Sequence, residues 1–143
     1  MEKPVLILLA EDEPLIGLSV RESLEEGGYA VHVAATGREA LAAIEGDDFE
    51  LAGLITDIRL GGGPDGWALA RRARELKPEL PVVYISGDSA HEHRARGVPD
   101  SLMVQKPFAE MLNSSSFFYE RWARAARGRV CVRCRVSPPA ARH

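Results

Sequence analysis

Short apolar runs alternate along this 143-residue chain with stretches in which apolar residues recur at helical spacing. The runs occupy residues 5–10, 29–34, 51–57, 81–86 and 101–105. Runs that are short and apolar throughout are typical of strands buried on both faces of a sheet. Strands that alternate with helices in this way predict a parallel sheet covered by helices on both faces.

Helix-starting and helix-capping residues set the expected helix boundaries. Pro14 is suited to the first turn of a helix, where its missing N–H costs little. Thr36 is expected to cap the next helix, with Glu39 at the capping-box position. Residues 88–96 are polar and weakly amphipathic, which predicts a short or loose helix. A last helix of undefined length is expected to begin at Phe108.

Length and charge exclude several classes of protein. The chain has the size of one domain, and no run approaches the roughly 18 apolar residues that span a membrane. The N-terminus lacks the features of a signal peptide, so we expect a cytoplasmic protein. Residues 1–108 carry 11 Lys and Arg against 19 Asp and Glu, whereas residues 109–143 carry 7 Arg against 2 Glu. An acidic body of net charge −8 disfavours nucleic acid as the main ligand.

Reactive side chains stand at the ends of four predicted strands. The acidic run 11–13 follows the first strand, Asp57 ends the third, Ser86 ends the fourth, and Lys106 follows the fifth. Parallel strands end at one edge of a sheet, where open α/β folds bind ligands. We therefore expect carboxylates, a hydroxyl and an ammonium to meet in one cleft.

That set of groups suits a magnesium ion beside a phosphoryl group. Mg²⁺ takes one or two carboxylates and keeps several waters, so Asp12 and Asp57 are candidate direct ligands and Glu11 can hold a coordinated water. Asp57 is also the candidate nucleophile toward phosphorus, with the metal neutralising the charge of the incoming group. A phosphorylated Asp57 would attract Lys106 and a hydrogen bond from Ser86, and a movement of Ser86 would switch its loop.

Each of these residues also has a structural explanation. Glu11 and Glu13 can act as charges that favour a helix N-terminus. Asp57 can cap a loop, Ser86 can stabilise a turn, and Lys106 can be a solvated surface residue. Because the residues stand at successive strand ends, a common site is favoured over separate structural roles.

Five segments carry a family resemblance: residues 6–14, 54–60, 65–66, 82–87 and 106–108. In order and spacing they resemble the receiver domain of bacterial two-component response regulators, the CheY-like family. The resemblance implies a flavodoxin-like, doubly wound five-stranded parallel sheet of order 2-1-3-4-5, with helices on both faces. We expect a receiver domain over residues 1–112, followed over residues 113–143 by an irregular final helix and a basic, flexible tail.

The resemblance also implies a function. Asp57 would accept a phosphoryl group from a histidine kinase or a histidine phosphotransfer protein. The magnesium ligands would be Asp12, Asp57 and the main-chain carbonyl of Arg59, with Glu11 in the outer coordination sphere. Ser86 would be the switch residue, and Lys106 would pair with the phosphoryl group.

The chain departs from the family in several places. Met103 stands three residues before Lys106, where the family usually has Tyr or Phe, so a repacking of Met is expected in place of an aromatic switch. The loop 61–64 is longer and richer in Gly than is common. His91 and His93 are expected to be solvated surface groups, and dimerisation is left open.

The sequence left after the resemblance is short. About 30 residues cannot build an independent core, so a stand-alone receiver is expected, acting by contact with a downstream protein target. Slow self-dephosphorylation would be its only turnover, so it is not expected to be an enzyme in the ordinary sense.

Two other functions stay open. A magnesium-dependent phosphohydrolase could also pass through an aspartyl phosphate, but such enzymes place a second acid where this chain has Arg59. The Arg-rich segment 120–143 could bind nucleic acid, although it contains no recognisable module. Cys131 and Cys134 form a Cys-x-x-Cys with only His143 nearby, too few ligands for a structural zinc site.

Overall fold

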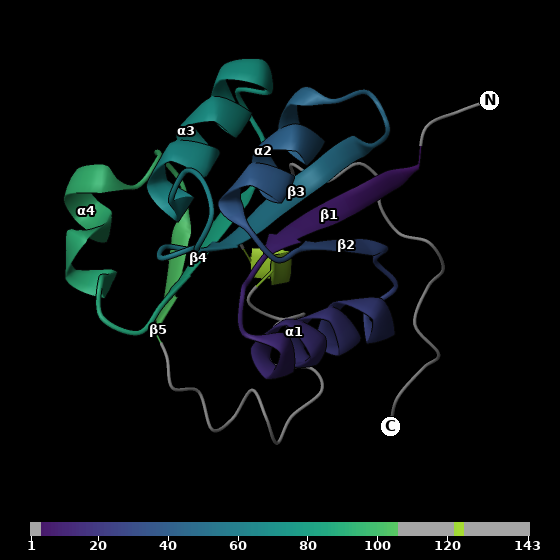
Figure 1. Cartoon of the computed structure of the whole chain (residues 1–143), viewed down its shortest axis with the longest axis horizontal. Coiled ribbons are helices and arrows are strands. Elements are labelled where there is room, and N and C mark those ends of the chain that lie inside the picture. The colour runs from purple at the N-terminus through teal and green to yellow at the C-terminus, as the bar shows by residue number, and fades with distance from the viewer. Residues whose placement is uncertain (1–3, 106–121, 125–143) are drawn as a thin grey trace.

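Five parallel strands form one sheet in a computed structural model that describes residues 4–105 and 122–124. The strands are β1 (Val5–Ala10), β2 (Val31–Ala34), β3 (Glu50–Asp57), β4 (Val82–Ser86) and β5 (Leu102–Gln105). Their spatial order is β2-β1-β3-β4-β5 (Figure 1). The predicted sheet and its strand order are confirmed. Lys106, the helix expected from Phe108 and nearly all of the tail lie outside the described residues.

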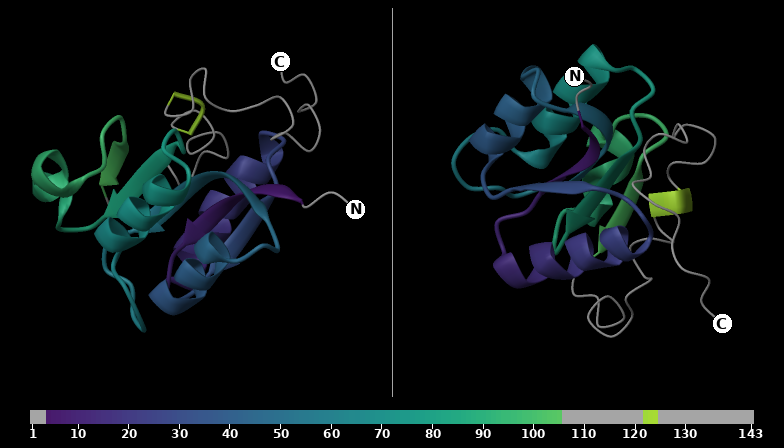
Figure 2. Two further views of the ribbon diagram at one scale, coloured as in Figure 1. Left: turned by 90° about the horizontal axis from the view of Figure 1, so that it is seen from above. Right: turned by 90° about the vertical axis from the view of Figure 1, so that its right-hand side faces the viewer.

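Helices cover both faces of this sheet. They are α1 (Pro14–Glu26), α2 (Gly37–Glu45), α3 (Gly66–Leu76), the single 3-10 turn η1 (Ala90–Glu92) and α4 (His93–Arg96). Helices α2 and α3 lie together on one face and α1 lies on the other (Figures 1 and 2). The loose helix expected over 88–96 is thus one 3-10 turn followed by four helical residues. Within the described residues no helix is long and apolar enough to span a membrane.

Strand residues alternate between two hydrophobic clusters, one on each face of the sheet. The cluster on the α1 side contains Ile7, Leu9, Val20, Leu24, Ile55, Val83, Ile85 and Val104. The cluster on the α2 and α3 side contains Leu8, Leu54, Trp67, Leu69, Val82 and Tyr84. Because both faces are covered, the strands are apolar throughout, as the sequence pattern indicated.

Side-chain caps fix where two helices begin. The Thr36 hydroxyl accepts a hydrogen bond from the N–H of Glu39 at 3.1 Å, which confirms the predicted cap of α2. The Glu39 carboxylate accepts from the N–H of Ala35 at 2.9 Å, one residue before the cap. Helix α3 is capped by Asp65, whose carboxylate accepts from the N–H of Ala68 at 2.9 Å. The sequence analysis had not assigned that cap.

The α1 face of the sheet is completed by Trp122, whose side chain is fully buried. Its ring lies directly against Gly53 of β3, so that a Cβ atom at residue 53 would overlap ring carbon Cη2. Its ring also meets Tyr29 edge to face, with 6.2 Å between the ring centroids. Trp122 therefore holds a segment distant in sequence against the middle of the sheet.

Candidate functional site

Three carboxylates meet at the carboxyl edge of the sheet. Glu11 and Asp12 follow β1, Asp57 ends β3, and one oxygen from each lies within 4.8 Å of the others. The strands bring them together because Ala10 pairs in register with Thr56 at the ends of β1 and β3. Glu11 and Asp57 are buried, whereas Asp12 is exposed. Solvent therefore reaches Asp12 but hardly reaches Glu11 and Asp57.

Backbone hydrogen bonds hold the end of β3 in place. The N–H of Arg59 donates to Oδ1 of Asp57 at 3.2 Å. The Thr56 hydroxyl donates to the main-chain oxygen of Asp57 at 2.8 Å. Only 7% of Asp57 is exposed. These contacts fix the carboxylate of Asp57 at the base of a depression.

That depression, which we call the acidic cup, has a volume of about 420 Å³. Its lining residues are Asp12, Glu13, Asp57, Arg59, Gly87 and Asp88. Carboxylate oxygens are the hard ligands that Mg²⁺ prefers, and the lining residues that the structure describes include no Cys or His to favour a softer metal. Several negative charges this close together are also best accommodated around a cation. The cup therefore fits a magnesium ion.

Ser86 lies beside the cup and is not among its lining residues. The side chain at the end of β4 is only 1% exposed. Its hydroxyl oxygen accepts the N–H of Ser89 at 2.6 Å and that of Asp88 at 3.2 Å. Of the residues expected to converge, the structure thus brings Glu11, Asp12 and Asp57 together. It places Ser86 next to them, with its oxygen turned toward its own loop.

An ion pair that the sequence analysis missed joins two of the residues that line the cup. Nη2 of Arg59 lies 3.0 Å from Oδ2 of Asp88. Arg59 belongs to the loop between β3 and α3, and Asp88 to the loop between β4 and η1. Arg59 stands two residues beyond Asp57, and Asp88 stands two residues beyond Ser86. Opposite charges at equal distances from the ends of neighbouring strands are the sequence signal that could have revealed the pair.

Met103 has an aromatic neighbour on the next strand. It pairs in register with Tyr84 of β4 and packs against the α3-side cluster. The Tyr84 hydroxyl accepts the N–H of Val98 at 3.0 Å, and its ring lies 4.8 Å from that of Trp67. Burial raises the pKa of Tyr84. The aromatic group in this region therefore stands on β4 and is fixed by a hydrogen bond.

The expectation that His93 is solvated was wrong. Its ring meets that of Tyr84 edge to face at 5.6 Å between centroids, and its Nε2 lies 2.9 Å from Oγ of Ser101. The side chain is half-buried, and burial lowers the pKa of His93. The residues before β5 fold back over the ring, a contact that local polarity does not reveal. His91, by contrast, is exposed as expected.

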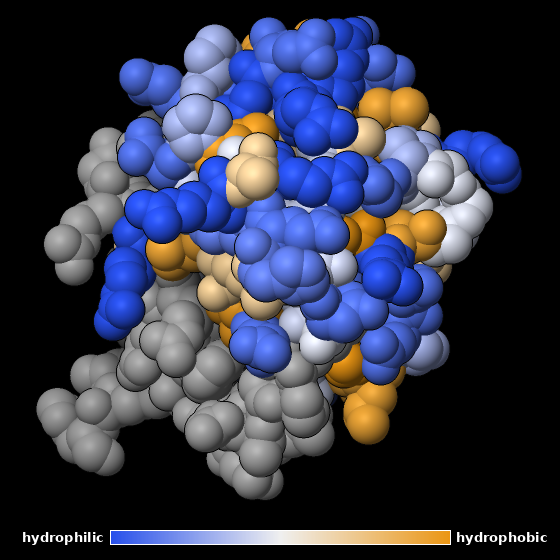
Figure 3. Space-filling view, turned by 90° about the vertical axis from the view of Figure 1, so that its left-hand side faces the viewer, coloured by the Kyte–Doolittle hydropathy of each residue, from blue (hydrophilic) through white to orange (hydrophobic). Residues whose placement is uncertain are grey.

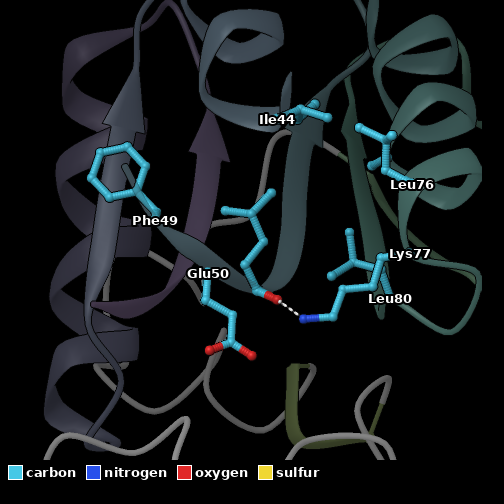
Figure 4. Close-up of a pocket in the computed structure, with 8 residues that line it drawn as sticks. Ile44, Phe49, Glu50, Leu76, Lys77 and Leu80 are labelled. Atoms are coloured by element: carbon cyan, nitrogen blue, oxygen red, sulfur yellow. Dashed lines mark hydrogen bonds between the residues drawn. The ribbon is translucent and has the colours of Figure 1, made fainter. Parts of the chain in front are cut away.

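A second depression, of about 370 Å³, lies at the opposite edge of the sheet (Figure 4). Most of its lining is apolar, from Ile44, Phe49, Leu51, Ala73, Leu76 and Leu80. The ammonium group of Lys77 donates to the main-chain oxygen of Leu51 at 2.6 Å. Among the described lining residues, Glu50 is the only acid. The groups that suit metal and phosphoryl chemistry are therefore those of the acidic cup.

Comparison with known proteins agrees with this geometry. The family model of the response regulator receiver domain matches residues 7–112, which is most of the chain. The chain belongs to the response regulator receiver family. The predicted CheY-like receiver fold and its role in two-component signalling are thereby confirmed.

Relatives of this receiver domain include proteins of different length. The response regulator receiver protein CpdR of Brucella abortus is 38% identical over 104 residues, which cover 71% of this chain and 84% of CpdR. The transcriptional regulatory protein TcrA of Mycobacterium tuberculosis is 32% identical over 106 residues, covering 73% of this chain and 41% of TcrA. The receiver domain therefore spans less than half of that longer relative.

Solved receiver structures share the fold. A response regulator receiver protein from Sinorhizobium medicae superposes with a TM-score of 0.68 at 38% sequence identity. The match covers 80% of this chain and 98% of the other. The five-stranded sheet with acids at its carboxyl edge is thus a receiver architecture.

Proposed function

We propose that Asp57 is the phosphoacceptor of this receiver domain and that its donor is a phosphohistidine on a kinase or a phosphotransfer protein. The observation that carries the proposal is the position of Asp57, at the base of the acidic cup with oxygens of Glu11 and Asp12 within 4.8 Å. Asp57 is the nearly buried acid that lines the cup, so an attacking oxygen there is shielded from most of the solvent.

The residues of the cup would hold Mg²⁺ through oxygen ligands. We assign Asp12, Asp57 and the main-chain carbonyl of Arg59 as direct ligands, with Glu11 holding a coordinated water. When bound, the ion supplies positive charge that offsets repulsion between the carboxylates and an incoming phosphoryl group.

The reaction is an in-line displacement at phosphorus. A carboxylate oxygen of Asp57 forms a bond to phosphorus as the bond between phosphorus and the donor imidazole nitrogen breaks. That nitrogen keeps the electron pair of the broken bond and takes up a proton. The Ser86 hydroxyl would donate a hydrogen bond to one phosphoryl oxygen, and the Lys106 ammonium would pair with another.

An apolar pair on α1 is suited to receive the donor protein. Leu15 and Leu18 are 66% and 52% exposed and stand one turn apart near the N-terminus of the helix, so they share one face. Asp12 and Glu13, which line the cup, directly precede that helix. An amphipathic helix that carries the phosphohistidine could dock its apolar side on this pair and reach Asp57.

The output surface would differ in character from that docking surface. The side of the molecule that carries α3 and α4 is mainly hydrophilic (Figure 3). Arg71 of α3 and Arg94 of α4 are exposed. A downstream protein that binds this side would therefore be recognised through polar and acidic groups.

A phosphohydrolase is disfavoured by the same geometry. The position two residues beyond Asp57 is occupied by Arg59, whose guanidinium contacts Asp88. A guanidinium group has no acceptor and cannot act as the general acid and base that turnover needs. The proposed chemistry therefore stops at transfer to Asp57 and slow hydrolysis of the product.

The test is incubation with acetyl phosphate and Mg²⁺, followed by intact-protein and peptide mass spectrometry. We expect one phosphoryl adduct on Asp57, lost in Asp57→Asn and on chelation of the metal. Asp47→Asn, a change in the turn between α2 and β3, is the control and should keep the adduct. An adduct on another residue would contradict the assignment, and rapid multiple-turnover hydrolysis of a phosphomonoester would favour the phosphohydrolase.

A further inference from the structure

The ion pair between Arg59 and Asp88 joins two residues that line the acidic cup. It joins the loop that follows β3 to the loop that follows β4, with 3.0 Å between Nη2 and Oδ2. The two side chains are 76% and 58% exposed, and both line the cup. Ion pairs this exposed are weak, so this one can open at little cost.

Arg59 is the single cation among the lining residues that the structure describes. Its other neighbours in the lining are acidic, apart from Gly87. Its main chain is anchored by the hydrogen bond from its N–H to Asp57, whereas its guanidinium is held only by Asp88 among the contacts described. Among the described residues, Arg59 is therefore the cation that a dianionic phosphoryl group entering the cup would meet, and its present partner is a carboxylate.

Asp88 connects that cation to the loop of Ser86. Its Oδ1 accepts the Ser89 hydroxyl at 3.1 Å while its Oδ2 faces Arg59. Its N–H donates to the hydroxyl oxygen of Ser86 at 3.2 Å. The same short loop thus contains the hydroxyl expected to contact a phosphoryl group and the acid that occupies Arg59.

We propose that Arg59 captures the phosphoryl donor at the mouth of the cup by exchanging Asp88 for donor oxygens. Guanidinium groups bind phosphoryl oxygens in a bidentate geometry that a single carboxylate oxygen does not provide. Asp88 then competes with the anionic donor for the guanidinium of Arg59, and this competition sets how readily the donor enters the cup. Once Arg59 has exchanged its partner, the loop that carries Ser86 and Asp88 loses a tether to the β3 side.

This proposal rests on the proposed role of Asp57 and is tested by the rate of its phosphorylation. Acetyl phosphate is the probe: the bond from phosphorus to Asp57 forms as the bond from phosphorus to the acetate oxygen breaks, and acetate leaves with the electron pair. The variants are Arg59→Gln, Asp88→Asn and the double variant, with Arg71→Gln on the outer side of α3 as the control.

We expect Arg59→Gln to lower the rate at least threefold and Asp88→Asn to raise it at least threefold. In the double variant the rate should equal that of Arg59→Gln, because Asp88 acts through Arg59. With phosphoramidate, a donor that carries less negative charge than acetyl phosphate, the same substitutions should change the phosphorylation rate less. If Asp88→Asn raised the phosphorylation rate equally with and without Arg59, the proposal would be overturned, because Asp88 would then act by repelling the anionic donor directly. A phosphorylation rate that Arg59→Gln leaves unchanged would also overturn it.

A second readout does not depend on phosphorylation. Amide hydrogen exchange at Asp88 and Ser89, measured by NMR without metal, should be faster in Arg59→Gln than in the parent chain. Equal exchange rates would show that the ion pair does not hold the loop and would also overturn the proposal. Failure of the parent chain to form any adduct on Asp57 would instead count against the proposed function.

Discussion

The indole of Trp122 occupies the space directly above Gly53, in the middle of β3, where any larger residue would place its side chain. Gly53→Ala should therefore destabilise the protein by about 1–3 kcal/mol, the usual cost of overpacking a core. Urea denaturation measures the change. Gly61→Ala is the control, because no atom lies within 4 Å of the Cβ that it adds.

The same contact makes the two positions energetically coupled. Trp122→Ala should cost about 3–5 kcal/mol through the cavity that it leaves. In that background Gly53→Ala should cost far less than it does alone, because the overlapping ring is gone. If the two costs simply add, the segment 122–124 does not pack on β3 in solution.

Removing one charge from the acidic cup should separate folding stability from metal binding. In EDTA, Asp12→Asn should raise the melting temperature by about 3–5 °C, because two like charges about 4–5 Å apart repel by about 1 kcal/mol even in water. Saturating Mg²⁺ should stabilise the parent chain by about 2.7 kcal/mol at 100 times the dissociation constant, and the variant much less. Glu22→Gln on α1 should leave both quantities unchanged, and an equal metal response in both proteins would remove Asp12 from the ligand set.

His93 should make stability depend on pH in the mildly acidic range. Burial lowers the pKa of His93 in the folded protein, whereas an unfolded histidine titrates near about 6.5. Between these values the unfolded chain binds more protons. The contribution of His93 is therefore complete above about pH 6.5 and is lost as the pH falls through the folded pKa.

The measurement is the free energy of unfolding at several pH values. His93→Gln should weaken the decline below about pH 6.5, whereas the exposed His91→Gln should leave the curve unchanged. Identical pH dependence in all three proteins would mean that His93 titrates alike in the folded and unfolded states.

Leu15 and Leu18 should matter for a protein donor and not for a small one. Replacing both with Ala is expected to slow phosphoryl transfer from a phosphorylated histidine phosphotransfer protein about tenfold or more, a loss of at least about 1.4 kcal/mol. The rate with acetyl phosphate should stay within twofold of the parent. Leu76→Ala removes an equally exposed side chain at the opposite edge of the sheet and should change neither rate. If the double variant were phosphorylated more slowly by both the phosphotransfer protein and acetyl phosphate, the substitutions would have damaged the acidic cup itself.

Much of the fold could be predicted because the information is local. Strands buried on both faces must be apolar throughout, and helices that cover them must carry an apolar stripe, so the alternation along the chain determines a doubly wound sheet. Asp12 and Asp57 could be placed together for the same reason, since parallel strands end at one edge.

The missed features depend on side-chain directions across loops. The hydroxyl oxygen of Ser86 accepts hydrogen bonds from the N–H groups of Ser89 and Asp88, a contact that depends on turn geometry and that the strand-end pattern does not encode. The half-buried position of His93 depends on Ser101, eight residues along the chain. An aromatic residue at position 122 could be expected to pack against the body of the domain, but its contact with Gly53 joins residues far apart in sequence, and no local periodicity encodes that partner.

The depth of Asp57 has a consequence for timing. An acyl phosphate decays when water reaches phosphorus in line with the bond that breaks, and Asp57 is only 7% exposed. The burial of Asp57 would limit the approach of water in the same way. If Asp57 is the phosphoacceptor, the depth that shields its carboxylate would therefore also lengthen the lifetime of the phosphorylated state.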